Sequence, residues 1–158
     1  MSAKFLIKSV FALMLPLSTL CGLAQMPNPY GLPINLEKAK MVAAPALDEA
    51  RKNNWTVAVA IVDIAGNLVY FEKMDNTQTG SVNVAIDKAR SAALFKRPTK
   101  VFQETLAAAG DGLRVLRLQG AVPIDGGIPL LIEGSIGVSG AAAQQDGQCA
   151  KAGADALK

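Results

Sequence analysis

The segment DGGIPLLIEGSIGVSG, Asp125–Gly140, is the most informative part of the sequence about the fold, because it holds two short apolar runs with a tight turn between them. The runs are Ile128–Ile132 and Ser135–Ser139, and Glu133-Gly134 separates them. Short runs rich in Ile, Leu and Val and bounded by glycine predict the two strands of a hairpin. The glycine spacing is GxxGxxG rather than the G-x-G-x-x-G of dinucleotide sites, so the stretch predicts a fold more than a reaction.

The N-terminal segment, residues 1–24, has the pattern of a secretion signal. A charged start precedes the apolar run Val10–Leu20, and the small residues Gly22 and Ala24 stand before a cleavage position at Gln25. The apolar run is short for a membrane span. We therefore expect the segment to be removed, which leaves a periplasmic or secreted protein with no stable membrane span. A retained anchor is the alternative.

The charge and cysteine content of the mature chain exclude several classes of protein. Lys4 and Lys8 are two of the 16 basic residues, so removal of the segment leaves 14 basic residues against 13 acidic ones, a net charge of +1. That balance argues against nucleic-acid binding. The chain has no histidine, which excludes a His-based catalytic triad and His-ligated zinc or haem. Cys149 is the one cysteine after the segment; we expect a small buried hydrophobe, with an intersubunit bridge as the alternative.

The first half of the mature chain predicts an arm, a helix and a strand pair. Residues 25–35 hold three prolines and a glycine and predict an extended arm before a single domain at 36–158. Apolar residues recur at helical spacing from Leu36 to Asn53, and Pro45 is expected to kink or split that helix. Trp55–Val62 alternates bulky and small apolar side chains and predicts a strand covered on both faces, with Leu68–Lys73 as its antiparallel partner.

The second half adds helices and the glycine hairpin. Ser81–Lys96 has a small apolar face and predicts a helix, and Thr99 is placed to cap a further helix at Lys100–Ala109. Gly120–Ile124 is expected to form a short strand, and Ala142–Leu157 a final helix. The order of elements predicts an α+β fold, an antiparallel sheet of about five strands flanked by helices on both faces.

The strongest candidate for a binding surface is a run of cations. Five basic residues and no acid lie between Lys88 and Lys100. Beside Phe95, basic side chains such as Arg90, Lys96 and Arg97 suit the carboxylates of an apolar ligand, because arginine binds a carboxylate through two hydrogen bonds. The alternative is a solvated helix end, where cations complement the helix dipole. Tyr70 on the second strand is either a half-buried sheet residue or an oxygen ligand of iron.

Four blocks of the chain together resemble the GlcG/HbpS-type domain, a DUF336-like family often labelled haem-degrading. They are Val57–Asn67, Lys88–Thr99, Gly126–Gly140 and Asp146–Gly153. The resemblance covers essentially the whole mature chain, Leu36 to Lys158. Its motifs are far more specific for the family than for an activity.

The resemblance implies dimers or larger rings, and a tetrapyrrole near the Pro98-Thr99 segment and the glycine hairpin. The implied ligand-binding residues are Arg90, Phe95, Lys96, Arg97, Thr99, Gly126, Gly127 and Pro129. Family members with a histidine near the pocket ligate iron through it. This chain has none, so the candidate iron ligands are Thr99 or Tyr70, which bind more weakly than imidazole.

We therefore expect an exported, oligomeric protein that binds haem or another flat acidic small molecule. Two other classes stay open. One is an enzyme that acts on a small hydroxy-acid or corrinoid-type substrate, which requires a converging acid–base pair in a pocket. The other is a ligand-free scaffold or sensor-accessory protein. The sequence does not decide whether the protein turns over a substrate.

Overall fold

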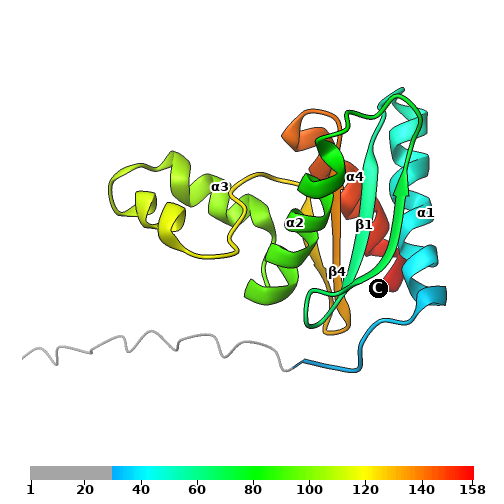
Figure 1. The fold of residues 1–158 in the computed structure, drawn as a ribbon, viewed down its shortest axis with the longest axis horizontal. Helices are drawn as coiled ribbons and strands as arrows, with labels where there is room; N and C mark the ends of the chain where they lie inside the picture. Colours follow the sequence, from blue (N-terminus) through cyan, green and yellow to red (C-terminus); the bar gives the residue numbers. More distant parts are fainter. Residues whose placement is uncertain (1–29) are drawn as a thin grey trace, which may run out of the picture.

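The computed structural model describes residues 30–158, which form a four-stranded antiparallel sheet with helices on both faces (Figure 1). This confirms the α+β class, while the predicted signal and most of the arm lie outside the described residues. The elements in chain order are α1 (Leu36–Lys52), β1 (Ala58–Asp63), β2 (Leu68–Lys73), α2 (Ser81–Phe95), α3 (Thr99–Ala107), the 3-10 helix η1 (Gly110–Arg117), β3 (Gly127–Leu130), β4 (Gly134–Ser139), α4 (Ala143–Ala154) and the 3-10 turn η2 (Asp155–Leu157).

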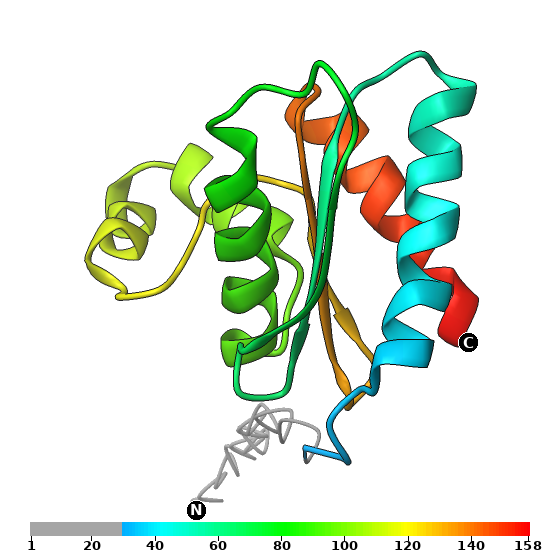
Figure 2. The ribbon, with the colours of Figure 1, turned by 45° about the vertical axis from the view of Figure 1, so that its right-hand side comes forward.

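The sheet has the order β2-β1-β4-β3, so the first and last strand pairs meet at its centre. The predicted glycine hairpin is β3–β4, with Ile128 opposite Ile136. β1 then pairs with β4, with Ile61 opposite Ile136, and this non-local pairing joins the two hairpins. In Figure 2 the sheet is seen nearly edge-on, with α2 on one side and α1 and α4 on the other.

The two faces of the sheet differ in side-chain size, as the alternation in β1 predicts. Val57, Val59 and Ile61 are fully buried in a core with α1 and α4. Ala58 and Ala60 point the other way and pack against α2. The bulky face holds the larger core, and the small face lets a helix approach the sheet closely.

Helix α2 approaches so closely that β4 needs glycine beneath it. A Cβ atom at Gly137 would lie 2.0 Å from the Ala85 carbonyl oxygen and 2.5 Å from the Ala89 backbone nitrogen. Real side chains do not reach such distances, so a larger residue would push the helix off the sheet. Small residues on both partners, predicted for α2 from its alanines, therefore set the spacing of these two layers.

The predicted sheet of about five strands is wrong by one strand, because Gly120–Ile124 forms none. The Val122 N–H donates to the Ser91 hydroxyl at 3.0 Å, and the Ile124 N–H donates to the Val122 carbonyl at 2.9 Å. These two donors are thus used by a side chain of α2 and by a local turn. The segment crosses from η1 to β3 without entering the sheet.

Pro45 was expected to kink or split α1, and the split does not occur. The helix runs unbroken through it for 17 residues. Proline removes one helical hydrogen bond, but Val42, Ala43, Ala46 and Leu47 on either side of it are buried. Burial of this apolar face against the sheet and α4 outweighs the lost bond, which is how amphipathic helices gain most of their stability.

Cys149 lies in the interior of the larger core, as a small hydrophobe. Its exposed fraction is 0%, and burial raises the pKa of the thiol to about 12. The buried position confirms the first of the two expectations for this residue and keeps the sulfur away from any neighbouring subunit.

We expect Gly137→Ala to destabilise the fold by about 3 kcal/mol, the upper part of the range for overpacking, because its methyl group meets helix backbone. Gly80→Ala is the matched control, since no atom lies within 4 Å of a Cβ built there. Urea unfolding followed by circular dichroism measures both. Equal midpoints for the two variants would show that α2 moves away at little cost.

We expect the Cys149 thiol of a folded Cys21→Ser chain to resist dithionitrobenzoate at pH 8. The thiolate is the reactive form, and with a pKa of about 12 it is scarce at that pH. The thiol keeps its proton to a higher pH in the folded chain than in the unfolded chain, where its ordinary pKa is about 8.5. The free energy of unfolding should therefore fall as pH rises from about 8.5 to the folded-state pKa of about 12. Labelling should follow unfolding in urea; rapid labelling without denaturant would contradict the buried position.

Candidate functional site

The cation run predicted from the sequence lies at the junction of α2 and α3, where the chain reverses direction. Lys96 ends α2 in the left-handed region at φ 51°, and Pro98 precedes the first residue of α3. A left-handed residue followed by proline ends one helix and allows the next to start at once. The turn leaves Lys96 and Arg97 on a corner rather than along a helix.

Aromatic rings and cations gather at this corner. The Phe95 and Phe102 rings meet edge to face, with centroids 5.1 Å apart. The Arg97 guanidinium carbon lies 5.8 Å from the centre of the Phe102 ring, and the Lys96 ammonium lies 3.7 Å from the centre of the Tyr30 ring. Cations over ring faces gain from the ring quadrupole, so the corner holds its positive charge beside apolar surface.

Part of the apolar side of the corner is exposed as well, although Phe102 is buried. We define the α2–α3 corner as Leu94, Phe95, Arg97, Val101 and Phe102. Leu94 and Val101 are exposed to 50% and 39%, and Arg97 is exposed too. The surface therefore offers what a flat apolar molecule with an acidic group requires: open hydrophobic area and an arginine beside it.

Beyond the corner, α3 and η1 project away from the sheet as a separate lobe (Figure 1). The lobe carries three exposed leucines and two basic residues in one short segment. They are Leu113, Leu116, Leu118, Arg114 and Arg117. The lobe therefore also offers exposed apolar and positive side chains.

Two predicted site residues lie elsewhere. The Arg90 Nε donates to the Gly66 carbonyl at 3.1 Å, which places Arg90 at the β1–β2 turn. Tyr70 lies on β2, and its hydroxyl donates to Glu72 Oε2 at 2.5 Å. Because β2 and β3 are opposite edges of the sheet and strands lie about 4.8 Å apart, Tyr70 is roughly 14 Å from the β3 edge. Tyr70 and Thr99 therefore cannot ligate the same iron.

Thr99 and the adjacent glycines Gly126 and Gly127 lie close together inside the protein. The Gly127 N–H donates to the Thr99 hydroxyl oxygen at 2.9 Å, and Thr99 is 0% exposed. A Cβ atom at Gly127 would lie 2.4 Å from the Lys88 carbonyl oxygen, so the close approach made by this glycine is to α2. Thr99 would reach an iron atom only if the Gly127 segment moved. Pro129 lies half-buried on β3.

The polar cluster that the sequence did not reveal is a buried ion pair between α2 and α4. Lys88 Nζ lies 2.8 Å from Asp146 Oδ2 and donates to the Val138 carbonyl at 3.0 Å. The Ala141 N–H donates to the other Asp146 oxygen at 3.0 Å. In the sequence Lys88 belongs to the run of cations that predicts a binding surface, although Ala85 and Ala92 at helical spacing around it indicate burial.

Burial also affects the ionisation of Asp146. It raises the pKa of the Asp146 carboxyl. The ion pair with Lys88 opposes this rise, and the nearby negative charge of Asp125 adds to it. The side chains of Lys88 and Asp146 are 1% and 3% exposed. An acid and a base converge here, as an enzyme would need, but they face each other rather than solvent.

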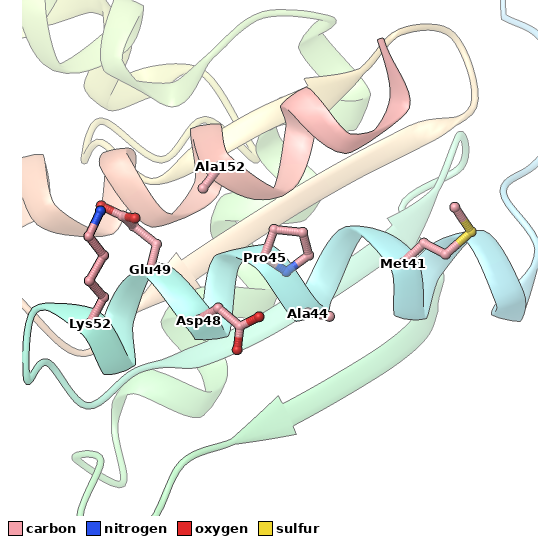
Figure 3. A pocket seen from close by; sticks show the side chains of 7 residues that line it. All are labelled: Met41, Ala44, Pro45, Asp48, Glu49, Lys52 and Ala152. Carbon is pink, nitrogen blue, oxygen red and sulfur yellow. The ribbon is translucent and has the colours of Figure 1, made fainter.

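A separate shallow groove of about 480 Å³ lies between α1 and α4 (Figure 3). Met41, Pro45 and Glu49 line it along α1, and Ala152 borders it from α4. The Glu49 carboxylate already accepts a hydrogen bond from Gln148 at 2.5 Å. The groove contains none of the predicted site residues.

Two negative findings apply to residues 30–158. Within this range no three histidine, cysteine or acidic side chains gather as a metal site would require. None of the helices there has the length and apolar character needed to cross a membrane.

Comparison with known proteins gives a consistent result. The family model described as haem degrading protein HbpS-like matches residues 34–155. Protein GlcG of Escherichia coli K12 is 34% identical over 103 residues, which are 65% of this chain and 75% of GlcG.

Two solved structures show the same architecture. A double mutant of Streptomyces reticuli HbpS superimposes with a TM-score of 0.72 at 31% identity, over 83% of this chain and 91% of that one. The complex of PduOC with haem has a TM-score of 0.69 at 25% identity, over 80% and 96% of the two chains.

Removal of one partner of the buried ion pair should be costly. We expect Lys88→Met to destabilise the fold by about 3–5 kcal/mol, because it leaves the Asp146 carboxyl buried without its cation. The double variant Lys88→Met/Asp146→Leu should recover most of that loss, as measured by urea unfolding. A double variant as unstable as the sum of both single variants would show that the two side chains act independently.

Proposed function

Because the chain belongs to the haem-degrading HbpS-like family, we propose that it binds haem or a related tetrapyrrole at the α2–α3 corner. The observation that carries the proposal is the Arg97 guanidinium beside the Phe95–Phe102 pair, with open apolar surface around it. The complex of the similar protein PduOC with haem supports the ligand class.

The residues of the corner suit the periphery of a haem molecule. Haem is a flat apolar ring with two carboxylate side chains. Arg97 is placed to bind a carboxylate through a charge-assisted hydrogen bond, and the exposed Leu94 and Val101 offer apolar contact to the ring. Lys96 adds positive charge on the same corner.

The same residues do not fit a strong iron ligand set. The chain has no histidine, the Thr99 hydroxyl is buried against Gly127, and Tyr70 lies on the opposite edge strand. Binding is therefore expected to depend on the ring and its carboxylates. We derive no redox step from this site.

Export and assembly belong to the same proposal. The charged start, apolar run and small residues before Gln25 support secretion to the periplasm or the medium. The near-neutral net charge of the chain after that position does not oppose association into a homo-oligomer.

Arg97→Ala should weaken haemin binding about 10- to 150-fold, the effect of about 1.5–3 kcal/mol that one hydrogen bond to a charged group contributes. Titration of the wild type and the variant at one salt concentration, followed in the Soret band, measures the two dissociation constants. The midpoint of urea unfolding should change little, because Arg97 is exposed.

Arg90→Ala is the matched control, since Arg90 is an exposed arginine of α2 whose Nε donates to the Gly66 carbonyl at the β1–β2 turn, away from the corner. It should leave haemin affinity unchanged. Equal losses for both variants would indicate general electrostatic attraction. Unchanged affinity in both would remove the corner as the binding site.

A further inference from the structure

The two edges of the sheet are not equally protected against pairing with another strand. β3 is a strand of only four residues that contains Pro129, and proline blunts a sheet edge. β2 has six residues, no proline and no glycine. Within residues 30–158 it pairs with β1 alone, so its outer side has no strand partner in the described part of the chain.

The backbone groups that β2 presents outward can be assigned from the ladder. In an antiparallel pair every second residue exchanges hydrogen bonds with its partner. The Met74 N–H donates to the Val57 carbonyl at 3.0 Å. The alternation therefore directs Glu72 and Tyr70 toward β1 and leaves the N–H and C=O groups of Phe71 and Lys73 facing outward.

The side chains along this edge are incompletely covered. Helix α2 packs on β1, β3 and β4, so β2 lies at the rim of the α2 layer. Phe71 reaches that layer only in part and remains half-exposed. On the other face Tyr70 is half-buried beside the larger core. An open ladder bordered by half-covered aromatic side chains suits another strand laid alongside.

We propose that β2 pairs with β2 of a second copy of this chain, antiparallel about a two-fold axis at Phe71, which joins two four-stranded sheets into one of eight strands. A two-fold interface uses the same patch on both subunits. In this register the two Phe71 residues exchange backbone hydrogen bonds, and their rings meet on the α2 side.

Hydrogen bonding between Tyr70 and Glu72 and the avoidance of like charges favour this register and this partner. With the axis at Phe71, Glu72 faces Tyr70 of the other copy, and Lys73 faces Val69. The Tyr70 hydroxyl already donates to Glu72 within one chain at 2.5 Å, so the two pairs come together as a polar cluster of four side chains. A shift of the axis to Lys73 would place two lysines directly opposite each other, which destabilises a strand pair.

The first test is the mass of the assembly. Analytical ultracentrifugation should find the wild type at twice the chain mass or more. Phe71→Lys, which puts a charge on the edge, should reduce the mass to half or less. Leu116→Lys, the same kind of change on the exposed surface of η1, should leave it unchanged. A monomeric wild type, or a Phe71→Lys variant with the wild-type mass, would overturn the proposal.

The second test does not depend on how well Phe71→Lys folds. In a Cys21→Ser background, Phe71→Cys should form a disulfide-linked dimer on oxidation, because directly opposite hydrogen-bonded residues have Cα atoms about 5.5 Å apart. Glu72→Cys should not, since its two copies are offset along the strands. Cross-linking at Glu72 rather than Phe71 would refute the register. Haemin is absent from both tests, so their result is independent of the proposed ligand.

Discussion

The buried ion pair between Lys88 and Asp146 joins the two helix layers of this protein, and the glycine hairpin is built around it. Lys88 extends from α2 on one face of the sheet, and Asp146 from α4 on the other (Figure 2). Burial of two charges is favourable only when further hydrogen bonds complete the site, and the Val138 carbonyl and the Ala141 N–H supply them. Gly126 must lack a side chain here, because its φ is +119° and a Cβ atom would lie 2.6 Å from the Val138 carbonyl oxygen that also binds the lysine.

The position of the outer surface follows from this interior contact. The Val138 N–H donates to the Gly126 carbonyl at 2.8 Å, which fixes the start of β3. The next residue, Gly127, then meets the Thr99 hydroxyl at the beginning of α3. Arg97 precedes that helix and is directed outward. The residues that form the interior thus orient a corner that they do not themselves line.

The candidate site shows how far a linear cluster of charges predicts a surface. Lys88, Arg90 and Arg97 are close in the sequence, but a helix turns by about 100° with each residue. Lys88 consequently points into the protein, Arg90 reaches the β1–β2 turn, and Arg97 stands on the corner beyond the helix end. The sequence indicated the composition of a binding surface, and helix rotation divided its members among three environments.

Features that depend on local periodicity could be predicted from the sequence: the helices, the hairpin of β3 and β4, and the opposite faces of Val59 and Ala60. The sequence also establishes the lack of histidine. Which groups meet across long sequence separations depends instead on the tertiary fold. The Val122 N–H donates to Ser91 instead of joining the sheet, and Lys88 pairs with Asp146, 58 residues away in the chain. A buried polar group forms its hydrogen bond with whichever partner the fold brings within reach. Because that partner can lie far away in the chain, it leaves no local pattern in the sequence.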